Sequence, residues 1–342
     1  MAQEGMSGKA GAARICVVGA GAIGGFFAAR LAGAGHDVSV LARGALTGIL
    51  QEHGIRLTSG GAETAYPVRA SDRAAELGVQ DIVIITVKAP ALASVAAAIG
   101  PLIGPETIVI PALNGIPWWF FLNEGVVLSG TRLKRVDPDG GIEASIPLPH
   151  VIGAVVIASC STSAPGQVVH ASGNKVVFGE PSGQPSERVD RVAAMFADAG
   201  FVATASPDIR RDIWAKLLGN ACFNPVSLLT QSPTDLMLAD PGLEQVFVGM
   251  MHELLALSRT LGIGLDIAPE QRIGETRKLG HIKTSMLQDL EAGRSVELDS
   301  IVGAAIEAAD AAHIDVPLLK TVFSMAVQRA RMAGIYAPHF TA

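Results

Sequence analysis

The sequence feature that most restricts the fold is a short apolar run that leads directly into a glycine-rich turn and then into a helical pattern. Residues 15–18 are apolar, residues 26–32 have a helical composition, and between them lie Gly19, Ala20, Gly21, Ala22, Ile23 and Gly24. In such a strand, turn and helix, the glycines permit a tight turn, a close approach to a pyrophosphate and close packing of helix on strand. Free N–H groups at the helix start favour phosphates. The pattern predicts a Rossmann-type dinucleotide site, and a glycine turn without a ligand is the alternative.

A cationic residue stands where the second predicted strand ends. Residues 37–42 are a largely apolar run, and Arg43 follows them. A fold that prefers NAD has an acidic residue here for the ribose hydroxyls, whereas arginine suits a 2′-phosphate. Arg43 therefore favours NADP over NAD, and a solvated surface arginine is the alternative.

Two further predicted strands also end in polar residues. Residues 81–87 lead to Lys88, and residues 107–113 lead to Asn114 in an Asn-Gly pair. Ligands bind at the carboxyl ends of parallel strands. We expect Lys88 to meet a ribose or a phosphate, and Asn114 to hold the nicotinamide ribose or the substrate beside it. The alternative for each is a plain turn residue, because Asn-Gly is also a common turn dipeptide.

An aromatic cluster, Trp118-Trp119-Phe120-Phe121, comes soon after this strand end. We expect it to form either a lid or wall over the nicotinamide, or a hydrophobic anchor for a subunit contact. Beyond it, residues 151–157, 175–178 and 201–204 resemble strands and residues 187–199 resemble a helix. The sheet is therefore expected to continue to about residue 205.

The second half of the chain has a helical pattern. Apolar residues recur three and four apart in residues 243–261 and 298–312, which predicts an all-helical domain. Ser206 is predicted to cap its first helix, and Pro225 to end or kink that helix. The apolar helix over 243–261 is expected either to close the domain's own core or to form a subunit interface.

Three polar side chains interrupt the apolar run of that first helix at intervals of four. Lys216, Asn220 and Asn224 would share one helical face. Burying an ammonium and two amides without partners costs roughly several kcal/mol, so a bound substrate is expected against them. The alternative is a lysine that reaches solvent at a helix end, with amides that cap neighbouring backbone.

A second polar pair lies later in the chain, where Ser285 is followed twelve residues later by Glu297. Gly293 is expected to close one helix and Ser295 to cap the next. Glu297 would then lie in a first helical turn, where the helix dipole favours a carboxylate whatever its function.

Composition limits the class of partner. The 342 residues suffice for two domains, and 49% hydrophobic residues can fill a core in each. A net charge of −6 speaks against nucleic acid or an anionic membrane as the main partner, and no apolar run is long enough to span a membrane. Cys16, Cys160 and Cys222 lack the spacing of a disulfide framework or a zinc site, so we expect no metal and a cytoplasmic location.

Together these features resemble the ketopantoate reductase (2-dehydropantoate 2-reductase) family from Arg14 to about residue 330. The matching features are GAGAIG, Arg43, Lys88 in TVKAP, Asn114 in LNG, Lys216-x-x-x-Asn220-x-x-x-Asn224-Pro225, and Ser285 with Glu297. The resemblance implies an α/β fold: a Rossmann-type, doubly wound NADP-binding domain followed by an all-helical domain, with the active site between them. We expect a flexible leader over 1–12, the first domain over 13–205 and the second over 206–338. A homodimer is also implied.

The resemblance also implies residue roles. Lys216 would be the catalytic lysine and Glu297 its acidic partner, because a fixed ammonium can stabilise and protonate the oxyanion that a reduced ketone forms. The residues implied to hold the 2-oxo acid substrate are Asn114, Asn220, Asn224 and Ser285. Those implied to hold NADPH or NADP+ are Gly19, Ala20, Gly21, Ala22, Ile23, Gly24, Arg43, Lys88, Asn114 and Glu297.

Two departures from the family pattern concern the substrate. Thr234 stands where the family often has a further substrate-binding asparagine, and residues 281–284 lack an asparagine.

The expected activity is NADPH-dependent reduction of ketopantoate to pantoate in pantothenate biosynthesis. The alternatives are reduction of another bulky 2-oxo acid, and a non-catalytic NADP-sensing protein. The presence of both Lys216 and Glu297 argues against the sensor.

Overall fold

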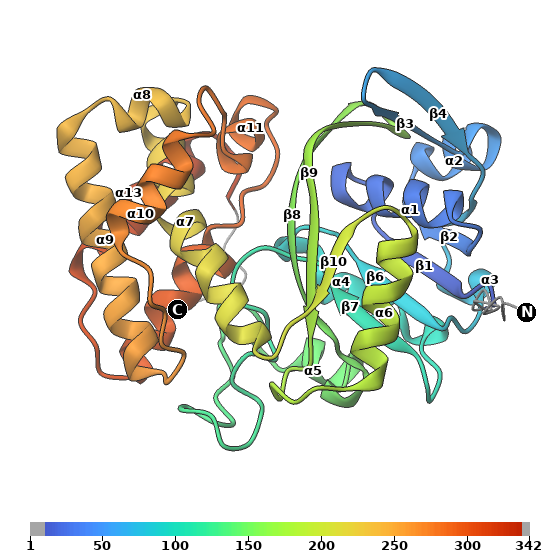
Figure 1. The fold of residues 1–342 in the computed structure, drawn as a ribbon, viewed down its shortest axis with the longest axis horizontal. Helices are drawn as coiled ribbons and strands as arrows, with labels where there is room; N and C mark the ends of the chain where they lie inside the picture. The colour runs from blue at the N-terminus through green and yellow to red at the C-terminus, as the bar shows by residue number, and fades with distance from the viewer. Residues whose placement is uncertain (1–10, 337–342) are drawn as a thin grey trace, which may run out of the picture.

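The computed structural model describes residues 11–336 and divides them between an α/β part and a helical part (Figure 1). Within these residues, the strands all lie at or before β10 (Val202–Ala205), and the regular elements after β10 are helical. Of the predicted leader, only Gly11 and Ala12 lie among the described residues. No helix in the described range has the length and hydropathy that a membrane span requires.

A parallel sheet begins the α/β part, with five strands in the described residues, ordered β5-β2-β1-β6-β7. Strand side chains alternate between faces, so Ile15 and Val17 of β1 pack with α1, whereas Cys16 and Val18 pack with α3 and α4. Helices on both faces confirm the predicted doubly wound sheet. Its elements are β1 (Arg14–Val18), α1 (Ala22–Gly33), β2 (Asp37–Leu41), α2 (Ala45–His53), β5 (Arg69–Ser71), α3 (Ala74–Leu77), β6 (Ile82–Ile85), η1 (Ala89–Ala91), α4 (Leu92–Ala96), η2 (Gly100–Leu102) and β7 (Ile108–Pro111).

The prediction that this sheet continues to residue 205 is wrong, because the later strands form a second, mixed sheet. Its longest strands are an antiparallel pair joined at Pro165-Gly166, where Gly166 has a φ of +76°. This turn folds the chain back on itself, and an isolated bridge between Val109 and Val151 links the two sheets. The second sheet contains β3 (Ile55–Ser59), β4 (Ala62–Tyr66), β8 (Gly153–Ala164), β9 (Gln167–Gly179) and β10. Helix α1 contacts both sheets, and α6 (Glu187–Asp198) packs on β9 and β10.

The helical part begins with α7 (Ile209–Thr230), and the prediction of its cap is wrong. Asp208, not Ser206, is its cap, because the Asp208 carboxylate directly precedes the helix and accepts from the Arg211 N–H at 3.1 Å. Of the two effects predicted for Pro225, ending the helix is also wrong, because α7 continues past this buried residue to Thr230. The remaining helices are α8 (Thr234–Leu238), α9 (Pro241–Thr260), α10 (Pro269–Arg277), α11 (Ser285–Glu291), the π-helical turn η4 (Asp299–Gly303), α12 (Ala304–Ala311) and α13 (Pro317–Met332).

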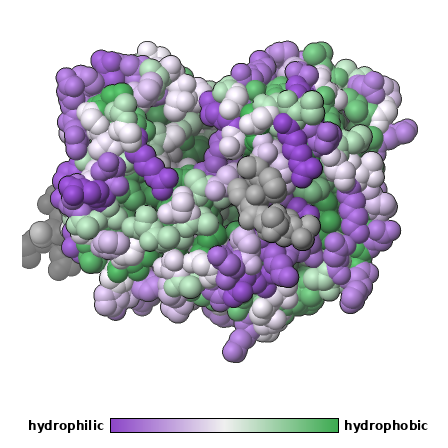
Figure 2. Space-filling view, turned by 180° about the vertical axis from the view of Figure 1, so that it is seen from behind, coloured by the Kyte–Doolittle hydropathy of each residue, from purple (hydrophilic) through white to green (hydrophobic). Residues whose placement is uncertain are grey.

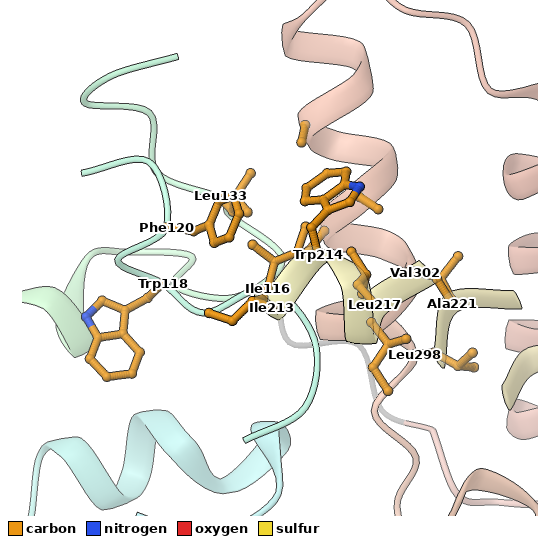
Figure 3. Close-up of a cluster of buried hydrophobic side chains, with 14 of the residues drawn as sticks. Ile116, Trp118, Phe120, Leu133, Ile213, Trp214, Leu217, Ala221, Leu298 and Val302 are labelled. Atoms are coloured by element: carbon orange, nitrogen blue, oxygen red, sulfur yellow. The ribbon is translucent and has the colours of Figure 1, made fainter. Parts of the chain in front are cut away.

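The aromatic cluster is part of the core, which contradicts both interpretations of it. Trp118, Trp119, Phe120 and Phe121 are at most 1% exposed, and side chains without exposed surface can neither close over a ligand nor contact another subunit. The Phe120 ring lies 5.9 Å from the Trp214 ring of α7, and Figure 3 shows α7 between this loop and the C-terminal helices. The loop between β7 and β8 includes α5 (Gly141–Ser145) and η3 (Leu148–His150).

Helix α9 also packs within the chain. Its apolar residues Phe247, Met250, Met251 and Leu254 are fully buried in the same core as α7 and α13. Of the two alternatives for residues 243–261, the packing therefore favours the domain's own core.

Candidate active site

The glycine turn after β1 has the shape that a dinucleotide requires. Gly19 has a φ of +93°, a conformation that favours glycine. A Cβ on Gly24 would overlap the Gly19 carbonyl oxygen, whereas a Cβ on Gly21 would meet nothing within 4 Å. The turn therefore packs tightly on its helix side and is open beside Gly21. Helix α1 begins at Ala22, and its first N–H groups have no partners inside the helix, so the turn fits a pyrophosphate.

The two predicted cofactor cations lie in different surroundings. Arg43 is exposed after β2, and its Nη2 lies 3.5 Å from Ser94 Oγ. Lys88 follows β6, and its Nζ lies 2.6 Å from Asp289 Oδ2 and 3.0 Å from the Ser295 carbonyl. Arg43 is thus open to a ligand, whereas Lys88 joins the α/β part to the helical part.

Three predicted site residues from distant parts of the chain form one hydrogen-bonded group. Lys216 Nζ donates to Asn114 Oδ1 at 2.9 Å and to the Val156 carbonyl at 2.8 Å. Asn114 Nδ2 donates to Glu297 Oε2 at 3.3 Å, and the Ala89 N–H donates to Glu297 Oε1 at 3.0 Å. An ammonium has three N–H donors, so these two acceptors leave one donor of Lys216 for a ligand.

Burial shifts the pKa values of both ionisable groups in this set. Removal from water lowers the pKa of Lys216 from 10.5 to about 8, and the nearby Glu297 charge opposes this shift. Burial raises the pKa of Glu297, which is 9% exposed, while the Ala89 and Asn114 hydrogen bonds and the Lys88 charge oppose the rise. The lysine can therefore exchange a proton near neutral pH.

The other three predicted substrate residues have no protein partner for their side chains among the described residues. Asn220 and Asn224 follow Lys216 at intervals of four on α7, as predicted, and Ser285 is the first residue of α11. Asn224 is 5% exposed, and its Nδ2 makes no hydrogen bond. An unpartnered buried amide is unfavourable, so a polar ligand is expected beside it.

The segment before Glu297 differs from its prediction. Gly293 has a φ of +61° just after α11, as expected of a residue that closes a helix. Ser295 does not cap the next helix, because residues 294–297 are not helical and the helix begins after Glu297. The Ser295 carbonyl instead accepts a hydrogen bond from Lys88. Glu297 itself precedes the helix, and its carbonyl accepts from the Ile301 N–H at 3.1 Å. The π-helical turn η4 follows at once.

The loop after β7 fits closely against η4. Gly115 has a φ of +86°, and a Cβ there would overlap the Ser300 carbonyl oxygen. The Ile116 N–H donates to the same carbonyl at 2.9 Å. This contact fixes Asn114, one residue before Gly115, relative to Glu297, three residues before Ser300.

Thr234 is not a substitute for the missing asparagine. Its single hydroxyl proton is shared between the carbonyls of Gly280 and Ile282, which lie 2.8 and 3.1 Å from Oγ1. The Val156 carbonyl and the Ala89 N–H were not predicted as site groups, because backbone groups leave no residue-type signal. Thr284 was not predicted either, although a threonine directly before a helix is a recognisable cap.

The surface has a notch between the two lobes of the molecule, visible at the upper edge of the rear view (Figure 2). A small cavity lies beside Lys216 and Asn220, against Leu113 and Ala154 from the α/β part. No group of three or more His, Cys, Asp or Glu residues in the described chain is placed to hold a metal ion.

Comparison with known proteins identifies the relatives of this chain. The family models "Ketopantoate reductase PanE/ApbA" and "Ketopantoate reductase PanE/ApbA C terminal" match residues 15–183 and 208–330. A 2-dehydropantoate 2-reductase of Mesorhizobium japonicum is 42% identical over 325 residues, covering 95% of this chain and 100% of the relative. One of Archaeoglobus fulgidus is 28% identical, covering 91% and 96%.

Solved structures agree with these sequence matches. A Ralstonia solanacearum protein assigned to ketopantoate reductase superposes with a TM-score of 0.91 at 46% identity, covering 95% of this chain and 100% of the other. The 2-dehydropantoate 2-reductase of Methylococcus capsulatus gives 0.79 at 28% identity, covering 93% and 97%. The fold and the arrangement of the two parts are therefore shared with these proteins.

Proposed function

The chain belongs to the ketopantoate reductase family, and we propose that it reduces ketopantoate to pantoate with NADPH. The observation that supports this activity most directly is the hydrogen-bonded group of Lys216, Asn114 and Glu297, together with the unpartnered buried amide of Asn224 on the same helix as Lys216. Reduction of a 2-oxo acid needs a proton donor at the ketone oxygen and hydrogen-bond donors at the carboxylate. The site offers both.

Lys216 would act as the general acid. NADPH, when bound, supplies the hydride that adds to the ketone carbon. The free N–H of Lys216 would stabilise the developing alkoxide and then transfer its proton to it, giving the alcohol and a neutral amine. The amine keeps its hydrogen bonds to Asn114 and Val156, so it stays in place until it takes a proton from solvent.

Glu297 and Asn114 would keep Lys216 charged and oriented. The Glu297 carboxylate raises the lysine pKa against the effect of burial. Asn114 lies between them, accepting from Lys216 and donating to Glu297, so its amide orientation is fixed by both partners. Asn220, Asn224 and Ser285 would bind the substrate carboxylate and hydroxyl and set which carbonyl face meets the nicotinamide.

The glycine turn, Arg43 and Lys88 would hold the cofactor. The open space beside Gly21 and the free N–H groups of α1 suit the pyrophosphate. The exposed guanidinium of Arg43 suits the 2′-phosphate that distinguishes NADPH from NADH. Lys88, Asn114 and Glu297 would lie along the riboses.

Arg43→Ala is expected to raise the KM for NADPH by about tenfold to a hundredfold, because one charge-assisted contact to phosphate is lost. The KM for NADH should stay the same. Arg56→Ala removes an exposed arginine that pairs with Glu63 on the β3–β4 hairpin, and it is the matched control. Steady-state kinetics with both cofactors checks this, and an equal loss with NADH would exclude a phosphate contact.

The pH dependence of kcat/KM is expected to have a limb near pH 8. The protonated lysine is the active form, so the rate is constant below its pKa of about 8 and falls about tenfold per pH unit above it. Glu297→Gln removes the charge that raises this pKa and should move the limb to lower pH. A profile that stays flat to pH 10 would mean that Lys216 is not the acid.

The first experiment is NADPH oxidation at 340 nm with ketopantoate, pyruvate and 2-oxoisovalerate, with NADH as the cofactor control. Turnover highest with ketopantoate supports the proposed activity. Turnover with another oxo acid alone would keep the mechanism and change the substrate. Tight NADPH binding without turnover on any acid would favour the sensing protein instead.

The remaining assignments follow from family membership. We propose that the enzyme serves pantothenate biosynthesis in the cytoplasm and acts as a homodimer. Light scattering of the purified protein tests the dimer directly.

A further inference from the structure

Three hydroxyl side chains connect α7 and α8 to the segment that leads into α11. Ser227 lies on α7 one turn after Asn224 and is fully buried, and Thr284 immediately precedes α11. Thr234 is the first residue of α8 and is 4% exposed. None of them belongs to the proposed catalytic group.

Ser227 and Thr284 form a hydrogen-bond chain with a fixed direction. The Leu287 N–H donates to Thr284 Oγ1 at 3.2 Å, and Ser227 Oγ donates to the Asn224 carbonyl at 2.8 Å. The two hydroxyls are hydrogen-bonded to each other. Since the Ser227 proton is used on Asn224, Thr284 must be the donor between them. The chain therefore runs from the first turn of α11 to the backbone of Asn224.

Thr234 holds the other end of the same segment. Its N–H donates to the Ile282 carbonyl at 2.9 Å, and its hydroxyl donates to the Gly280 and Ile282 carbonyls. Residues 280–284 are thus attached to α8 at one end and to α7 at the other. Ser285 comes next, and its exposed hydroxyl has no protein partner in the described part of the chain.

We propose that Ser227, Thr284 and Thr234 are positioning residues that hold Ser285 beside Asn224 and thereby set the affinity for the 2-oxo acid. This inference rests on the proposed reductase activity. The three residues do not touch the reacting atoms, so they affect the placement of the substrate more than the proton transfer. Thr234 then supports the substrate site through the backbone of residues 280–282.

Ser227→Ala is the main test, because it breaks the chain and leaves the Thr284 cap of α11 intact. We expect the KM for ketopantoate to rise about tenfold, with kcat changed less than about twofold and the Kd for NADPH unchanged. Thr284→Ser keeps both hydrogen bonds and should retain the wild-type KM, whereas Thr284→Val should raise it. Melting temperatures of all variants show whether they fold.

A double variant tests whether Ser227 and Thr284 act through one hydrogen-bond chain or independently. Ser227→Ala with Thr284→Val should raise the KM no further than Thr284→Val alone, because either change breaks the same chain. Additive increases in KM, or an unchanged KM in Ser227→Ala, would overturn the positioning role. If the wild-type enzyme still turns over ketopantoate, the proposed function stands in either case. Absence of wild-type turnover with every 2-oxo acid would overturn both.

Discussion

Lys216→Ala is expected to lower kcat/KM for ketopantoate by about a thousandfold or more. The change removes the proton donor and the cation at the developing alkoxide, and each effect is typically worth about a hundredfold or more. The Kd for NADPH should change little, because Lys216 is not among the residues proposed to hold the cofactor; its ammonium contacts Asn114 and the Val156 carbonyl. Stopped-flow or steady-state assays at 340 nm measure the rate, and fluorescence titration measures the cofactor affinity.

Lys320→Ala is the matched control for this experiment. Lys320 is a partly exposed lysine of the helical part that pairs with Asp310, so its removal should leave kcat/KM near the wild-type value. A Lys216→Ala enzyme that keeps more than about a tenth of the wild-type kcat/KM would contradict the role of Lys216 as general acid.

Trp214→Ala is expected to lower the free energy of unfolding by roughly 3–5 kcal/mol. Trp214 is fully buried on α7, packs near Phe120 and donates its indole N–H to the Leu254 carbonyl at 3.2 Å. Its loss would leave a cavity between the aromatic loop and α7 (Figure 3), next to Leu254 of α9. Urea unfolding followed by circular dichroism measures the change without relying on tryptophan fluorescence.

Trp214→Phe separates packing from the hydrogen bond. Phenylalanine fills most of the space, so the expected loss is smaller, roughly 1–2 kcal/mol. If the alanine variant unfolds at the same urea concentration as wild type, Trp214 does not link the loop to the helices. A phenylalanine variant as unstable as the alanine variant would instead assign the effect to the Leu254 contact.

The parts of the fold that the sequence predicted are those with local signals. The glycine turn follows a buried strand directly, and β1, β2, β6 and β7 of the parallel sheet are short, largely apolar runs. The edge strand β5 has no such run and was not predicted. The second sheet has weaker signals. Most of residues 158–174 in the β8–β9 hairpin are exposed or only partly buried and show no apolar run, and the β3–β4 hairpin over residues 55–66 is also largely exposed. Strand pairing there depends on distant partners, which one sequence does not specify.

In the candidate active site, too, local features were predicted and distant contacts were not. The spacing of Lys216, Asn220 and Asn224 predicted their common helical face, because helical periodicity is local. The contact of Asn114 with Glu297 joins residues 183 positions apart, and it was not predicted; the family resemblance implied only that Glu297 is the acidic partner of Lys216. The cap of α7 was misassigned because serine and aspartate are both good caps. The choice between Ser206 and Asp208 depends on how the chain leaves β10, which local sequence does not specify.

The π-helical turn after Glu297 lets this segment hold one additional residue without turning the helix. A π turn needs one residue more than an α-helical turn to complete the same rotation, so Asp299–Gly303 turns the chain about as far as an α-helical segment that is one residue shorter. Loss of one residue here would let the helix become regular and would leave the direction of Glu297 nearly unchanged. Loss of one residue from α12 would instead rotate everything before it by about 100° around the helix axis, and the Glu297 carboxylate would leave Asn114 and Ala89. In evolution, a one-residue gap should therefore be tolerated better in the π-helical turn than in α12.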